Sequence, residues 1–485
     1  MSFPFGWMNK AVQRKPLPFA KAKPKPVDPQ GQRLLGFTLD TNEPLWAPKG
    51  HSLLLAANGG GKTTCGAMPW LYSFAASEPD KAVLVLDSKN GEMAIQVAEM
   101  LAGMGRKVAV IDDMGVWTDL EAYRISLNPF GAAVATYKRD PRDMIYTSEN
   151  ITYAAIKEPA DGDAKNIFFR AWPRNLIEFC ILLYAKRNLQ LVIPGGVSLL
   201  LSNQDMLLQF ATIEAEEGDP YLKGLARSIV AMSKHEQWPQ HVEEAQRALK
   251  IFAPGTRLHE AGKGATITHE QLIREGYIIF LVGPQKFMTR LGAYYAFHMM
   301  AFAEALYQDA GVLRIIADEF TNCPLQSLVE MLTTLRAFGA EVHMICQSRS
   351  EIERKFGVKE AETITENAIV QIWYGFSSLK EAQMASEMIG EEHALSTSLG
   401  SNDDLKLNTN ISLIRQRQMS VAELLSMPRD QQLIFVKGIG FLLARKVGMQ
   451  NLAPFCHKVG KNELEGGILP ADPWIAFSTL KGGAG

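Results

Sequence analysis

Short runs of apolar and β-branched residues, bounded by glycine, aspartate or proline, recur along the chain and predict buried strands. These runs lie at 52–57, 82–87, 107–112, 277–283, 312–318, 341–347, 369–375 and 432–438. Apolar residues at helical spacing fill most intervals between them, as in residues 91–105 and 325–339. Continuous apolar strands that alternate with helices are typical of a parallel sheet covered on both faces, so we predict a doubly wound α/β domain.

One long interval departs from this alternation. Residues 139–264 show little strand signal, while helical periodicity recurs within them at 166–187, 205–217 and 241–253. We therefore predict that an all-α domain at 139–264 is inserted into an α/β domain formed by residues 31–138 and 265–455. The flanking residues, 1–30 and 456–485, are predicted to be tails.

Composition narrows the class of protein. The 485 residues are 47% hydrophobic and 21% charged, with a net charge of -2, as expected of a folded soluble protein without bulk attraction to nucleic acid. The apolar stretches at 176–185 and 291–307 contain ionisable residues and predict core helices, not membrane spans. Residues 9–27 hold six Lys or Arg, four prolines and no acid, which indicates either a disordered tail or an arm that contacts anionic lipid or nucleic acid.

A glycine-rich stretch, "LLLAANGGGKTTCGAMP" at 53–69, follows one predicted strand and opens a predicted helix. It fits the phosphate-loop pattern GxxxxGK[ST], except that alanine stands at the first glycine position. Such a loop turns backbone N–H groups toward phosphate oxygens, while its lysine reaches the β and γ phosphates and its hydroxyl binds Mg²⁺. The alternative is a flexible turn that happens to contain a lysine. We predict that ATP and Mg²⁺ bind here, through Ala56, Asn58, Gly59, Gly60, Gly61, Lys62, Thr63 and Thr64.

Further candidate residues lie downstream. The apolar run "VLRIIADEF" ends in Asp318 and Glu319, which suit a magnesium ligand and a residue that polarises the attacking water, or else a plain helix cap. Gln347 ends the next predicted strand, where it either senses the γ phosphate or is merely solvated. Arg336 lies between these strands and is either a surface residue or a group that reaches the nucleotide of a neighbouring subunit.

Nine elements occur in a fixed order along the chain: the phosphate loop, then "LDSKNGE", "LNPF", "NIFFRAW", "ADEFTNCP", "LRAFG", "ICQSRSEIERKFG", "AQMASEMIG" and "MSVAELLSMPRDQQLIFVKGI". In this order they resemble the coupling proteins of type IV secretion and conjugation, over about Gly31 to Val447. The resemblance implies a RecA-like motor with an inserted all-α domain, which assembles as a hexamer and hydrolyses ATP. Its implied partners are DNA or relaxosome proteins, the ATPases of the secretion channel and inner-membrane components.

The resemblance also implies roles for individual residues. Lys62 and Thr63 would bind nucleotide and Mg²⁺, Asp318 and Glu319 would form the Walker B pair, Gln347 would sense nucleotide, and Arg336 would act in trans.

The chain departs from the family pattern at three places, and these departures affect what can be carried over from the family. Ala56 replaces a glycine, and "DSKNGE" is one residue longer than the common form, which leaves the roles of Asp87, Lys89 and Glu92 open. The usual two N-terminal membrane helices are replaced by the basic tail, so we expect a cytoplasmic protein held at the membrane by this tail or by a partner. Two alternatives stay open: an ATPase that couples effector proteins without moving DNA, and a nucleotide-gated adaptor with little turnover.

Overall fold

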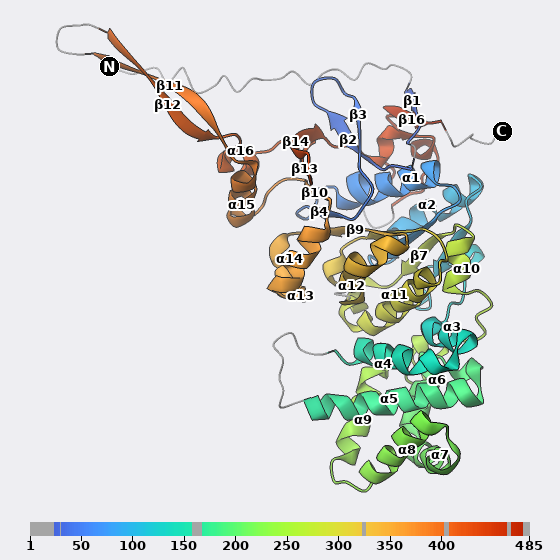
Figure 1. Ribbon diagram of the computed structural model, residues 1–485. Helices are drawn as coiled ribbons and strands as arrows, with labels where there is room; N and C mark the ends of the chain where they lie inside the picture. The colour runs from blue at the N-terminus through green and yellow to red at the C-terminus, as the bar shows by residue number, and fades with distance from the viewer. Residues whose placement is uncertain are drawn as a thin grey trace.

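The structure, a computed structural model, describes residues 24–29, 31–157, 167–322, 326–401, 407–462 and 467–478. Its centre is an 11-stranded sheet (Figure 1). In spatial order the strands are β3 (Pro44–Trp46), β2 (Leu34–Thr38), β14 (Gly440–Arg445), β13 (Gln431–Val436), β10 (Val370–Trp373), β4 (Ser52–Leu55), β9 (Ala340–Cys346), β8 (Leu313–Ala317), β5 (Ala82–Asp87), β7 (Ile278–Val282) and β6 (Val108–Ile111).

All eight predicted strands are present in this sheet. From β10 to β6 every neighbouring pair is parallel, whereas β13 runs antiparallel to β10. The antiparallel strands β14, β2 and β3 then extend the sheet. The prediction of a mostly parallel α/β sheet is confirmed, but these three extension strands were missed because they are short or only half-buried.

Both faces of the sheet are covered, as continuous apolar strands require. Leu54 points into a core with α1 (Met68–Ser77) and α2 (Glu92–Gly103). Its neighbours Leu53 and Leu55 point into the opposite core. That core contains residues of α11 (Gly292–Tyr307), α12 (Gln326–Thr334), α13 (Arg349–Phe356) and α14 (Val358–Asn367). Full burial of each leucine contributes about 2 kcal/mol, so both layers stabilise the sheet.

Helices fill the connection between the adjacent strands β6 and β7. They are α3 (Gly131–Arg139), α4 (Met144–Ala155), α5 (Ile167–Arg187), α6 (Pro194–Ser202), α7 (Gln204–Glu217), α8 (Pro220–Met232), α9 (Trp238–Ala248) and α10 (His269–Arg274). Within the described part of residues 139–264 there is no strand, as predicted, and Figure 1 shows α4 to α9 stacked away from the sheet. The limits of an independent domain stay a prediction. Among the described residues, no helix combines the length and apolarity that crossing a membrane would need.

The chain enters and leaves this helical insertion at a narrow neck. Gly262, at φ 82°, lies so close to Asn128 that an added Cβ would stand 2.5 Å from the Asn128 Cα atom. The Asn128 amide donates to the carbonyl oxygen of Val192 in the insertion at 2.8 Å. The "LNPF" element therefore forms the entry of the neck.

The predicted tails need correction, because parts of both are ordered. In a separate three-stranded sheet, β16 (Ile475–Phe477) lies between β1 (Lys25–Val27) and β15 (Leu452–Ala453). Ile475 and Phe477 are buried in the core that contains α1 and α2. Apolar side chains thus anchor segments that composition alone marks as tails. Residues 9–23 and the final "LKGGAG" lie outside the described residues.

A hairpin of β11 (Glu391–Ser401) and β12 (Leu407–Arg417) was not predicted. It pairs in antiparallel register from Glu391 with Arg417 to Ser401 with Leu407, and it shares no strand with the large sheet. Figure 1 shows it projecting from the region of α15 (Leu379–Ile389) and α16 (Val421–Leu425).

Candidate nucleotide site

The glycine-rich loop joins β4 to a π-helical turn, η1 (Lys62–Ala67), which leads into α1. Gly59 and Gly61 have φ values of 72° and 87°, a left-handed conformation that favours glycine. An added Cβ on Gly60 would stand 2.9 Å from the Ala57 carbonyl oxygen. Ala56, by contrast, is buried and is not among the residues with positive φ, so this position does not require glycine.

Four predicted residues come together at the carboxyl edge of the parallel strands. Lys62 extends from the loop, and its Nζ atom lies 3.0 Å from Oε1 of Glu319 and 3.1 Å from the Ala56 carbonyl oxygen. Thr63 donates its hydroxyl to Oδ2 of Asp318 at 3.0 Å. Asp318 and Glu319 directly follow β8, so the sheet carries both acids to the loop. All four side chains are buried.

Each of the two acids, Asp318 and Glu319, has one buried carboxylate oxygen without a hydrogen-bond partner among the described residues. Oδ1 of Asp318 and Oε2 of Glu319 are both buried and accept no hydrogen bond from the described residues. Burial raises the pKa of Asp318, while Lys89, Thr63 and Lys62 oppose this shift. Glu319 has φ 51°, a backbone conformation that costs a non-glycine residue about 1 kcal/mol or more.

Gln347 and Arg336 lie near opposite ends of strand β9. Gln347 directly follows β9, which stands between the loop strand β4 and the acid strand β8. Arg336 is exposed in the 3₁₀ turn η10 (Leu335–Phe338), just before β9 begins. There it helps to lower the pKa of His51, which burial chiefly depresses to about 4. The structure therefore places Gln347 at the same end of the strands as the loop, and Arg336 at the other end.

The turn after β5 contains the three residues whose roles the sequence left open. Asp87 accepts the backbone N–H of Ala94 at 2.7 Å and so holds the first turn of α2. Glu92 accepts from the side chain of Asn462 at 2.6 Å. Lys89 pairs with both acids, with its Nζ atom 3.4 Å from Oε1 of Glu319 and 3.8 Å from Oδ2 of Asp318.

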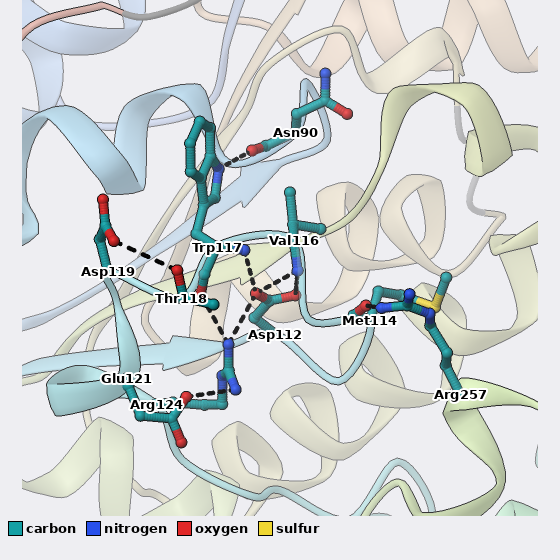
Figure 2. Close-up of polar contacts among 10 residues, drawn as sticks. All are labelled: Asn90, Asp112, Met114, Val116, Trp117, Thr118, Asp119, Glu121, Arg124 and Arg257. Atoms are coloured by element: carbon teal, nitrogen blue, oxygen red, sulfur yellow. Dashed lines mark hydrogen bonds and ion pairs between the residues drawn. The ribbon is translucent and has the colours of Figure 1, made fainter.

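A network of polar contacts supports this turn (Figure 2). The Trp117 indole donates to the carbonyl oxygen of Asn90, next to Lys89. Asp112 follows β6 and accepts the backbone N–H groups of Val116 and Trp117 at 2.8 to 3.1 Å. Arg257, from the helical insertion, donates to the carbonyl oxygen of Met114 in the same loop at 2.6 Å. This loop thus touches both the insertion and the turn that contains Lys89.

Sequence reasoning missed Lys446, which follows β14. Its Nζ atom lies 3.3 Å from the Gly60 carbonyl oxygen, 3.4 Å from the Tyr374 carbonyl oxygen and 4.4 Å from the centre of the Tyr374 ring. The Tyr374 hydroxyl in turn donates to the Cys65 carbonyl oxygen at 2.7 Å. Burial lowers the pKa of Lys446. No local pattern signals this contact, because Lys446 and Gly60 are 386 positions apart.

The polar groups of this site suit Mg²⁺ and a nucleoside triphosphate. The Thr63 hydroxyl and the Asp318 carboxylate supply the oxygen ligands that Mg²⁺ prefers, and the unpaired Asp318 oxygen remains available. The left-handed glycines and the N-terminus of the following helical turn form a cradle of the kind that binds phosphate.

Comparison with known proteins agrees with this geometry. Residues 312–429 match the family described as the TraM recognition site of TraD and TraG. Among solved structures, the bacterial conjugative coupling protein TrwB matches with a TM-score of 0.58 at 16% identity, over 82% of this chain and 85% of that chain. The chain resembles the coupling proteins of type IV secretion. The resemblance predicted from the motifs is thereby confirmed.

Other matches extend the likeness in fold. TrwB in complex with ADP and Mg²⁺ matches with a TM-score of 0.56 at 15% identity, over 82% of this chain and 85% of that chain. VirB4 of Thermoanaerobacter pseudethanolicus matches with a TM-score of 0.51 at 12% identity, over 87% of this chain and 98% of that chain. No curated protein matches the chain in sequence. The predicted RecA-like α/β fold is confirmed.

Proposed function

We propose that this protein is an ATP-hydrolysing coupling protein that links DNA in a relaxosome, or a protein cargo, to a type IV secretion channel and drives its transfer. The observation that carries the proposal is the meeting of Lys62, Thr63, Asp318 and Glu319 at one edge of a RecA-like sheet. The matches to the TraM recognition site and to TrwB, a plasmid coupling protein, support the coupling role.

We extend the proposal to assembly and location. The resemblance to coupling proteins implies a homo-hexamer as the active form. In such an assembly Arg336, which is exposed and lies away from its own loop, would serve a neighbour's nucleotide. The protein works in the cytoplasm, peripheral to the membrane, where it is held by its basic tail or by a partner. Channel ATPases and inner-membrane components are the proposed partners.

The mechanism assigns each residue one task. Backbone N–H groups of residues 58–64 bind the phosphates, and Lys62 exchanges its ion pair with Glu319 for the β and γ phosphates. Thr63 and Asp318 would hold Mg²⁺, which would neutralise charge on the phosphates. Glu319 accepts the proton of the attacking water, and Gln347 orients that water or senses the γ phosphate.

Removal of the loop lysine tests the nucleotide site. We expect Lys62→Ala to abolish ATP hydrolysis, because a charge on the phosphates is lost. The fold should persist, because Lys89 still pairs with Glu319 in the absence of Lys62. Turnover is measured by phosphate release and folding by circular dichroism, with the exposed Lys286→Ala as control. Wild-type turnover in a folded Lys62→Ala protein would overturn the assignment.

Glu319→Gln separates binding from hydrolysis. This variant keeps Thr63 and Asp318, so we expect it to retain ATP while turnover falls about 100-fold or more, as for the loss of a general base. Retention is measured with a fluorescent ATP analogue. A variant that cannot hold nucleotide would show that the two acids do not divide the work in this way.

DNA dependence separates the alternatives. A DNA pump should hydrolyse ATP faster with DNA and lose that stimulation at high salt, because phosphate contacts release counterions. ATPase rate and oligomeric mass are measured together, with and without DNA. Turnover that ignores DNA would favour coupling of protein effectors, and turnover near zero with every ligand would favour a nucleotide-gated adaptor.

A further inference from the structure

The loop after β6, residues 112–117, connects the helical insertion to the turn after β5 (Figure 2). In the middle of the loop, the carbonyl oxygen of Met114 accepts a hydrogen bond from Nη1 of Arg257 at 2.6 Å, and Arg257 belongs to the insertion. At the end of the loop, the Trp117 indole donates to the carbonyl oxygen of Asn90. One short loop thus contacts both the insertion and a turn beside the nucleotide site.

The loop is held as one piece between these two contacts. The carboxylate of Asp112, which is 2% exposed, accepts the backbone N–H groups of Val116 and Trp117 at 2.8 to 3.1 Å. Arg124 donates to the carbonyl oxygen of Trp117 at 2.8 Å and to Asp112 at 3.4 Å. Both backbone polar groups of Trp117 are therefore fixed, and a displacement at Met114 is carried to the indole.

The same loop is only lightly attached to the rest of the fold. The side chains of Met114, Val116 and Trp117 are partly buried, and Gly115 is exposed with φ 62°. Segments with few buried side chains open at a lower free energy than the strands of a core. The loop can therefore shift while the sheet stays intact.

The Trp117 ring meets the turn after β5 where its backbone is most constrained. Asn90 and Gly91 have φ values of 58° and 70°. An added Cβ on Gly91 would stand 3.2 Å from both Cδ1 and Nε1 of the indole, so the ring packs on this backbone as well as donating to it. The preceding residue is Lys89, whose Nζ atom lies 3.4 Å from Oε1 of Glu319. A shift of the indole therefore acts on a lysine that pairs with one of the two acids.

We propose that Trp117 and Arg257 are positioning residues, which transmit the position of the helical insertion to the nucleotide site through the loop of residues 112–117. A partner that binds the insertion and moves it would thereby change the rate of ATP hydrolysis. This inference rests on the proposed ATPase function. The effect falls on kcat and not on nucleotide affinity, because the phosphate loop follows β4, which two strands separate from β5.

A double-mutant cycle tests the connection. Trp117→Phe removes the indole N–H and keeps an aromatic ring, and Arg257→Met removes the guanidinium and keeps an apolar stem. We expect each variant to lower kcat about fivefold, at the low end of couplings between sites, with the Kd of a fluorescent ATP analogue within about twofold of the wild type. The double variant should be no slower than the slower single variant, because both changes break one connection. Arg257→Lys, which can still donate to Met114, should recover most of the lost kcat.

Two matched control variants carry the same substitutions elsewhere. Arg247→Met removes an exposed arginine of the insertion that pairs within its own helix, with Glu243 and Glu244. Trp474→Phe removes an indole that donates to Asp472 at 3.2 Å. We expect both controls to keep the kcat of the wild type.

Hydrogen exchange follows the same connection without hydrolysis. Backbone N–H groups in residues 88–92 and 112–118 are hydrogen-bonded, so their exchange reports local opening. We expect Arg257→Met to speed exchange about fivefold in both segments. When Trp117→Phe is already present, Arg257→Met should still speed exchange in residues 112–118 but have no further effect on residues 88–92.

The outcomes separate this inference from the proposed function. Faster exchange that is confined to residues 112–118 in Arg257→Met would overturn the inference, as would a double variant whose loss of kcat equals the product of the two single losses. Loss of nucleotide affinity with kcat preserved would contradict it as well. If the wild type does not hydrolyse ATP, yet exchange in residues 88–92 responds to Arg257→Met only through Trp117, the proposed function fails and the connection stands.

Discussion

Asp87 makes a contribution to the free energy of unfolding that depends on pH. Its carboxyl is buried, and this burial, with the charges of Asp318 and Glu92 adding to it, raises the pKa of Asp87 from 3.8 to about 8. The folded protein therefore binds this proton more tightly than the unfolded chain does. The contribution of Asp87 to stability is full below about pH 4 and is lost as pH rises to about 8.

We predict that Asp87→Asn removes this dependence, since an amide oxygen can still accept the N–H of Ala94 but does not ionise. The free energy of unfolding of the wild type should fall relative to the variant between pH 5 and 8, by at most about 1.4 kcal/mol per pH unit. Denaturant unfolding at several pH values measures this, with the exposed Asp119→Asn as control. Parallel curves for wild type and Asp87→Asn would contradict the prediction.

Among the individual residues, sequence analysis identified those that stand in a motif formed by their neighbours along the chain. Lys62 and Thr63 stand in a local pattern, and Asp318 and Glu319 end a recognisable strand. Lys89 was noticed without a role, because its partners depend on which strands lie side by side. The structure supplies that order, with β5 next to β8.

Among the elements, the antiparallel extension of the sheet supports the phosphate loop. β14 ends one residue before Lys446, whose buried ammonium bonds to the Gly60 and Tyr374 carbonyl oxygens. The extension was missed because β2, β3 and β14 are short and alternate weakly, and their pairing joins distant segments. The hairpin β11–β12 was missed for a related reason, since its strands have no apolar run that pattern analysis could find.

We predict that Lys446→Met loosens the loop. The free energy of unfolding should fall by about 1 kcal/mol through the lost hydrogen bonds, and nucleotide affinity should fall about fivefold. The matched control is Lys437→Met, because Lys437 is exposed on the connection between β13 and β14 and also donates to a backbone carbonyl, that of Glu366. Denaturant unfolding and titration of a fluorescent ATP analogue measure the two effects. Equal behaviour of both variants would show that Lys446 does not support the loop.

For the whole molecule, the helical insertion separates two adjacent strands of the sheet, and its described residues add no phosphate-binding element, so we propose that it recognises cargo or a cargo adaptor. We predict that deletion of residues 139–264, joined by a short linker, leaves nucleotide binding and removes cargo capture. The linker would join Lys138 to Ala265, which both line one cavity of about 1020 Å³. Circular dichroism and nucleotide titration check the fold, and cargo pull-down checks selection. A folded deletion protein that still captures the same cargo would contradict this role.

The position of β7 has a consequence for how the chain reaches its native state. β7 lies between β5 and β6, yet it follows both in sequence and is separated from β6 by the whole insertion. During synthesis β5 and β6 are made before β7, so the edges that pair with β7 stay unpaired until β7 has been made. Closing the long connection from β6 to β7, if it were flexible, would cost roughly 2 kcal/mol more in chain entropy than closing a short one. Early folding of the insertion would lower this entropic cost, because the close approach of Gly262 to Asn128 brings together the two segments that lead into and out of the insertion. The insertion would then aid the folding of the sheet whose strands it separates.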